Sequence, residues 1–81
     1  MKINYRTQGT CSSFIEVEVE NNKIKEVSFT GGCNGNLKGI CSLVKGMEVN
    51  EVISRLEGIR CGNKNTSCPD QLATALKEAL S

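Results

Sequence analysis

Residues 15–44 decide the fold of this chain and read IEVEVENNKIKEVSFTGGCNGNLKGICSLV. The first six residues alternate Ile or Val with Glu, and this period of two predicts a strand that buries one of its faces. Asn21 and Asn22 interrupt the alternation and residues 27–29 resume it, so the stretch predicts an antiparallel hairpin. Ile24 is an even-numbered position, whereas the apolar residues of the second run, Val27 and Phe29, are odd-numbered, so a regular strand would place Ile24 on the opposite face. We therefore expect a bulge, or a strand that starts after Ile24.

Helical spacing follows the hairpin and dominates the second half of the chain. Apolar residues recur every three or four positions after residue 36 and again in the last part of the sequence, which is typical of amphipathic helices. The complete prediction is an α+β domain with strands near residues 2–7, 13–20 and 25–30 and helices near residues 36–45, 50–57 and 69–80. We expect these 81 residues to form a single domain.

Three residues carry local predictions within the helices. Asn50 is predicted to cap the second helix, because an Asn side chain accepts hydrogen bonds from the first helical amides. Gly39 is a poor helix former, and its missing side chain predicts close packing of the first helix on the sheet. Asp70 follows Pro69 at the start of the last helix, where it is better explained by the helix dipole than by acid catalysis. The buried stripe predicted for the last helix consists of Leu72, Ala75, Leu76, Ala79 and Leu80.

Composition excludes several classes of function. The net charge is +1 with both signs interspersed, and the chain has one Tyr, two Phe and no Trp, so a basic, aromatic surface for nucleic acid is not expected. No apolar run is long enough for a membrane span or a secretory leader, and we expect a cytoplasmic protein without a membrane partner. The absence of His removes the commonest general base.

Five cysteines are a high number for so short a chain. A reducing cytoplasm disfavours disulfides, which makes metal-bound thiolates the better interpretation. Cys41 lies on the apolar stripe of the first predicted helix, and we expect it to be buried and to contribute packing alone. The other four flank strands, a loop and a helix start, which are positions suited to metal ligands: Cys11, Cys33, Cys61 and Cys68. The alternative is that these four are unrelated thiols.

The hairpin register brings two of these cysteines together. With the turn at Asn21 and Asn22, residues whose numbers add up to about 43 face each other, which places Cys11 beside Cys33 at the open end of the hairpin. Cys68 opens the last helix, and a helix N-terminus stabilises a thiolate.

Residues 66–70 spell TSCPD, and the chain resembles the small members of the TSCPD family. Similar segments extend over nearly the whole sequence: YRT (5–7), GTC (9–11), FTGGCNGN (29–36) and GIRCG (58–62). Related segments occur at the C-terminal end of adenosylcobalamin-dependent ribonucleotide reductases. The resemblance implies a reductase, or another protein, as a partner, although most members of the family have no assigned activity.

The order of elements also resembles the U-type iron–sulfur cluster scaffold proteins, through Cys11, Gly32-Cys33, Lys45-Gly46 and Cys68. This resemblance implies a three-stranded antiparallel sheet followed by three helices packed on one face. Two ligand positions of the scaffold are Ser13 and Ser67 here, and neither serine is a good cluster ligand. Cys61, which the scaffold lacks, is the candidate for a fourth ligand.

Four thiolates suit tetrahedral zinc or an iron–sulfur cluster, and the ligands alone do not separate these two. A closed site favours an accessory or interaction domain over an enzyme. The first hypothesis is therefore a zinc-binding domain, and the second is an iron–sulfur scaffold or carrier. A third is a thiol-redox or flavin-binding partner of ribonucleotide reduction, although no flavin fingerprint is present. The sequence leaves a homodimer open.

Overall fold

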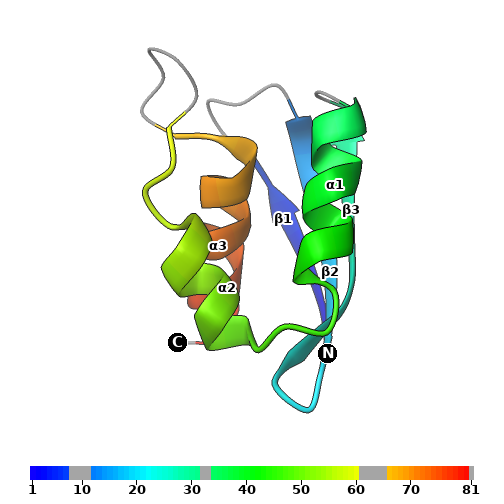
Figure 1. Cartoon of the computed structure of the whole chain (residues 1–81), viewed down its shortest axis with the longest axis vertical. Coiled ribbons are helices and arrows are strands. Elements are labelled where there is room, and N and C mark those ends of the chain that lie inside the picture. The colour runs from blue at the N-terminus through cyan, green and yellow to red at the C-terminus, as the bar shows by residue number, and fades with distance from the viewer. Residues whose placement is uncertain (8–11, 32–33, 61–65, 81) are drawn as a thin grey trace.

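The computed structural model describes residues 1–7, 12–31, 34–60 and 66–80. Within these residues three strands precede three helices (Figure 1), which confirms the α+β class. The elements are β1 (Lys2–Arg6), β2 (Ser12–Glu20), β3 (Lys23–Gly31), α1 (Asn34–Val44), α2 (Val49–Leu56) and α3 (Cys68–Leu80).

The strands form an antiparallel sheet in the order β1-β2-β3. Asn21 and Asn22 have φ angles of 54° and 67°, values that the two central residues of a type I′ hairpin turn require and that Asn tolerates well. The register shifts between Glu18 and Val19, so that Val19 pairs with Ile24. This shift is the irregularity predicted from the parity of Ile24, and it lets Ile24 share the buried face at 1% exposure.

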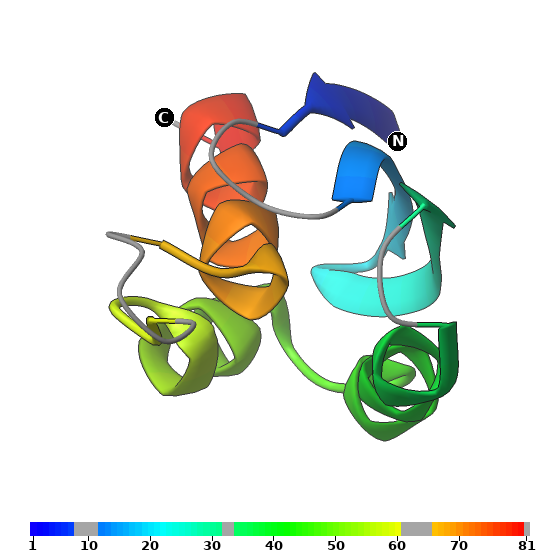
Figure 2. The same cartoon turned by 90° about the horizontal axis from the view of Figure 1, so that it is seen from above.

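Helices cover one face of the sheet (Figure 2). α1 packs beside β3, α3 packs beside β1, and α2 lies against α3 on the side away from the sheet. The side chains that are most buried between these layers are all aliphatic: Ile15, Val17, Ile24, Val49, Val52, Leu72 and Leu76. Each fully buried side chain of this size contributes about 1.5–3 kcal/mol of hydrophobic free energy. This core holds the sheet against the helices.

The predicted cap of the second helix is wrong. α2 begins at Val49 with Glu48 as the preceding residue, and no side chain caps it. The amide of Val49 instead donates a hydrogen bond to the carbonyl of Asn22 at 2.9 Å, and Val49 is buried. Contact with the hairpin turn therefore decides where α2 begins, and Asn50 lies exposed in its first turn.

Two predictions of burial are also corrected. Gly39 is exposed, and a Cβ atom at this position would meet nothing within 4 Å, so close packing does not explain this glycine. In α3, Ala79 is exposed whereas Ala73 is buried. The buried face of α3 is wider and begins earlier than predicted, because the helix contacts both β1 and α2. The side chain of Leu80 lies outside the described residues.

Candidate metal centre

One of the four predicted ligands lies within the described residues. Cys68 is the first residue of α3 and is 7% exposed. Cys11, Cys33 and Cys61 lie outside the described residues.

The open end of the hairpin lies at the same end of the molecule as the start of α3 (Figure 1). The last pair of β2 and β3 joins Ser12 to Gly31, which is the register predicted from the turn. Cys11 directly precedes Ser12 in the sequence, and Cys33 follows Gly31 by two positions. Ser12, Gly31 and the start of α3 therefore lie at one end of the fold.

Ser67 caps α3 with its side chain. Its Oγ accepts a hydrogen bond from the amide of Asp70 at 3.2 Å, which satisfies an amide that has no partner inside the helix. The same hydroxyl donates to the carbonyl of Ile59 at 2.7 Å, and Ser67 is only 3% exposed. This single side chain therefore starts the helix and holds the segment that leaves α2.

The carboxylate of Asp70 makes a second connection between the same two segments. Its Oδ1 accepts the amide of Gly58 at 2.7 Å, and its Oδ2 accepts the hydroxyl of Thr66. The hydrogen bonds from Thr66 and from Gly58 hold the pKa of Asp70 below its usual value, because both favour the ionised form. The prediction that Asp70 is a residue of the helix start is consistent with this geometry.

Thr66 and Gln71 extend this network. The amide Nε2 of Gln71 donates to Oγ1 of Thr66 at 3.1 Å, so the Thr66 hydroxyl both accepts and donates. Further along α3, Lys77 forms an ion pair with Glu57 at the end of α2. The hydrogen bonds of Ser67 with Ile59, of Asp70 with Gly58 and of Thr66 with Asp70 are together called the helix-start clamp. It joins the two flanks of residues 61–65.

Sequence reasoning did not find the clamp residues Thr66 and Ser67. A signal for Ser67 was present, because a Ser three residues before an Asp at a helix start is close to the capping-box pattern. No comparable signal pointed to Gly58 or Ile59. Their partners are 12 and 8 residues away in the chain, and no periodic pattern encodes such contacts.

Cys41 differs from its prediction in one respect. It packs against the core as expected, but it is half-buried instead of buried. Burial raises the pKa of its thiol, which disfavours the thiolate needed for metal binding. The thiol lines a hollow of about 230 Å³ between α1 and β3, together with Phe29, Leu37 and Lys38. These features agree with a packing role.

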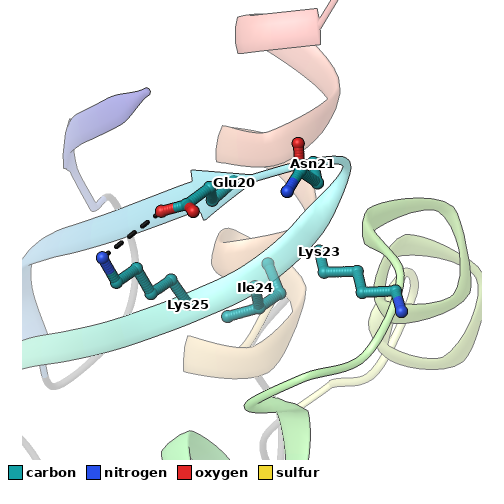
Figure 3. Close-up of a pocket in the computed structure, with 5 residues that line it drawn as sticks. All are labelled: Glu20, Asn21, Lys23, Ile24 and Lys25. Carbon is teal, nitrogen blue, oxygen red and sulfur yellow. Dashed lines mark ion pairs between the residues drawn. The ribbon is translucent and has the colours of Figure 1, made fainter.

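A second hollow of about 320 Å³ lies at the hairpin turn (Figure 3). Glu20 and Lys25 form an ion pair of 3.3 Å there, and Lys23 extends away from this pair. The lining holds neither a thiol nor a pair of carboxylates. Within residues 1–7, 12–31, 34–60 and 66–80 there is also no group of three or more Cys, Asp, Glu or His side chains able to hold a metal.

The chain matches the model of one protein family over nearly its whole length. The model of the TSCPD domain matches residues 2–80, so the protein belongs to the TSCPD domain family. No curated protein and no solved structure matches it. In the part of the chain that the structure describes, no helix is long and apolar enough to cross a membrane.

The expected relation to the iron–sulfur scaffolds receives no support from these comparisons. The order of strands and helices agrees with that expectation, but the order of elements alone does not establish a relation. The two serines at the scaffold's ligand positions have other partners. The hydroxyl of Ser13 donates to the carbonyl of Thr30 at 3.3 Å, and the Ser67 hydroxyl belongs to the helix-start clamp.

Proposed function

We propose that this TSCPD domain binds one metal ion through the thiolates of Cys11, Cys33, Cys61 and Cys68. Zinc is the first candidate, because four thiolates in closed tetrahedral coordination are typical of structural zinc sites. A closed site has no position for water or substrate, so the proposed role is that of an accessory or interaction domain. A cytoplasmic location would keep the thiols reduced.

The observation that supports this proposal is the position of Cys68. Its side chain is buried at the N-terminus of α3, where the helix dipole favours a negative thiolate. This helix start lies at the end of the molecule where the pairing of β2 and β3 finishes, with Ser12 opposite Gly31. In the sequence, Cys11 directly precedes Ser12, and Cys33 follows Gly31 by two positions.

Metal content tests the proposal directly. The protein is prepared anaerobically without metal-affinity resin, and its metals are measured by elemental analysis. We expect one zinc ion per chain, and a loss of zinc in each of the variants Cys11→Ser, Cys33→Ser, Cys61→Ser and Cys68→Ser. Cys41→Ser is the matched control and should retain the metal.

Other outcomes of this measurement favour the alternatives. Iron together with a brown colour would indicate an iron–sulfur cluster, which also accepts four cysteines. Protein that contains no metal, and whose thiols react equally with and without chelator, would favour a thiol-redox or flavin-binding role. Retention of full metal by Cys61→Ser alone would mean that another group completes the site.

The proposed partner is a ribonucleotide reductase, on the grounds of the family resemblance. Sedimentation of the metal-loaded domain, alone and mixed with an adenosylcobalamin-dependent reductase, measures both this association and a homodimer. A domain that sediments as a monomer, both alone and in the presence of the reductase, would argue against the homodimer and against the reductase as a partner.

A further inference from the structure

We propose that the groove between β3 and α1 binds an extended peptide segment that pairs with the outer edge of β3 and carries an acidic side chain. The main chain of this segment continues the sheet as a fourth strand. One of its apolar side chains enters the hollow beside Cys41, and a neighbouring carboxylate lies close to Lys38. The residues that line the hollow include none of the four proposed metal ligands, so the inference is independent of the metal site.

The first observation is that β3 forms one edge of the sheet. The strand order β1-β2-β3 places it there, and an edge strand presents amide and carbonyl groups to a further chain. At the turn end this edge already pairs with another segment. The amide of Ile24 donates to the carbonyl of Met47 at 2.9 Å, and the amide of Gly46 donates to the carbonyl of Ile24 at 2.8 Å. Within the described residues, β2 is the only segment with backbone hydrogen bonds to residues 27–30.

The second observation is a difference in how the two edges of the sheet are protected. Charged side chains and proline are common means of preventing an edge strand from pairing with another chain. The other edge strand, β1, has Lys2 and Arg6 at its ends, and β3 has Lys25 and Glu26 near its turn. Residues 27–30 read VSFT and contain neither a charge nor a proline. This part of β3 is therefore open to a further strand.

The third observation is the hollow between β3 and α1, which pack beside each other (Figure 1). Phe29, Leu37 and Cys41 contribute to the lining of its volume of about 230 Å³. Sites for small molecules are typically larger, at about 300–1,000 Å³, so the hollow suits side chains of a peptide better than a whole small ligand. In a strand added to β3, every second side chain faces the helices, which is the side of the sheet where this hollow lies.

The charge beside the hollow defines the chemistry of the segment. From Val27 to Gly46 the sequence contains Lys38 and Lys45 and no Asp or Glu. Lys38 lines the hollow and is exposed, and in the part of the chain that the structure describes neither lysine forms an ion pair. A cation beside an apolar hollow favours a segment that combines an acidic side chain with an apolar one. In strand addition, main-chain hydrogen bonds supply affinity and such side-chain contacts supply specificity.

Selection of peptides tests the proposal on the full chain. A random decapeptide library displayed on phage is selected on the immobilised protein under reducing conditions. We expect enriched sequences in which apolar residues alternate with other residues and in which Asp or Glu is over-represented. The most enriched peptide is then synthesised with a fluorophore, and its affinity is measured by fluorescence polarisation. Hydrogen exchange with and without this peptide should show slower exchange of the amides of residues 27–30 in the complex.

A matched pair of charge reversals tests the role of Lys38. Lys38→Glu should weaken binding of the peptide by about fivefold or more, because an exposed ion pair is replaced by a repulsion. Lys2→Glu makes the same change on the other edge strand and should keep the affinity within about twofold of the wild type. Both lysines are exposed, so we expect both variants to fold, and circular dichroism checks this.

Each remaining outcome would overturn the proposal. Selection that enriches no sequence would show that the groove binds no such segment. A peptide that binds Lys38→Glu as tightly as the wild type, or that leaves exchange of residues 27–30 unchanged, would bind elsewhere. A dimer in sedimentation, with residues 27–30 protected in the free protein, would make a second copy of the chain the occupant. None of these measurements depends on zinc content, so failure of the proposed metal site would leave the groove untouched.

Discussion

The two ends of the molecule are held in different ways. At the turn end, three backbone hydrogen bonds of 2.8–2.9 Å join residues 22–24 of the hairpin to residues 46–49, and the buried side chains there are Val19, Ile24, Val44 and Val49. At the other end, the Ser67 hydroxyl and the Asp70 carboxylate make the connections to residues 59 and 58, and Thr66 donates a hydrogen bond to the same carboxylate.

This difference predicts different sensitivities. A backbone hydrogen bond can form with almost any side chain on the residue. Apolar residues of similar volume also replace one another at a modest cost in stability. The helix-start clamp requires particular oxygen atoms at particular positions, and the proposed site requires particular thiols. Substitutions that remove apolar volume should therefore destabilise the turn end most. At the α3 end, the largest losses of stability should come from removing polar groups or metal.

Removal of metal should have the largest effect on stability. Binding energy at a site formed by distant segments becomes folding energy, which for structural zinc reaches on the order of 10 kcal/mol. This is comparable to the whole stability of a small domain. Chelator-treated protein should melt at a much lower temperature in circular dichroism, and added zinc should restore the transition. Equal melting temperatures before and after treatment would contradict a structural metal.

Truncation of Ile24 should have the next largest effect. Ile24→Ala removes a side chain that is 1% exposed, and such changes cost about 2–5 kcal/mol. Urea unfolding measures this loss. Leu43→Ala is the control, because Leu43 is 77% exposed and should change stability little. If Ile24→Ala were as stable as Leu43→Ala, packing would not be what holds the turn end.

Loss of the cap on α3 should cost less. Ser67→Ala removes the acceptor for the Asp70 amide and the donor to Ile59, and lost caps cost about 0.5–2 kcal/mol. Thermal unfolding should show this destabilisation. Ser13→Ala removes an exposed hydroxyl that bonds Thr30 at 3.3 Å, and is expected to be nearly silent. Equal melting temperatures of the two variants would show that the cap contributes nothing.

The smallest effect is an expected gain. Gly39→Ala should stabilise the protein by roughly 0.5–1 kcal/mol, because Ala is the better helix former and the added Cβ meets nothing within 4 Å. Gly46→Ala is the matched comparison. Gly46 has a φ of +87°, which costs an L-residue about 1–2 kcal/mol. The midpoint of chemical denaturation should therefore rise for Gly39→Ala and fall for Gly46→Ala. A shift of both midpoints in the same direction would contradict this account.

Much of the fold was predictable from local patterns. The alternation of β2, the turn at Asn21 and Asn22, and the irregularity next to Ile24 all follow from neighbouring residues, and each is present in the structure. For the site, the sequence supplied the four candidate thiols and the hairpin register, which the structure confirms as far as the pair of Ser12 and Gly31. The helix-start clamp could not be predicted from the sequence, because no local pattern at Gly58 or Ile59 indicates their hydrogen-bond partners.

The sequence by itself thus determined the type and order of the elements, because side-chain periodicity and the φ preferences of Asn and Gly act over a few residues. Tertiary structure decided that α2 begins at Val49 and not after Asn50, that Cys41 is only half-buried, and that Asp70 holds Gly58. These outcomes depend on which segments meet after folding. The hydrogen bonds and buried surface that select them form between residues far apart in the chain, where no repeating pattern records the partner.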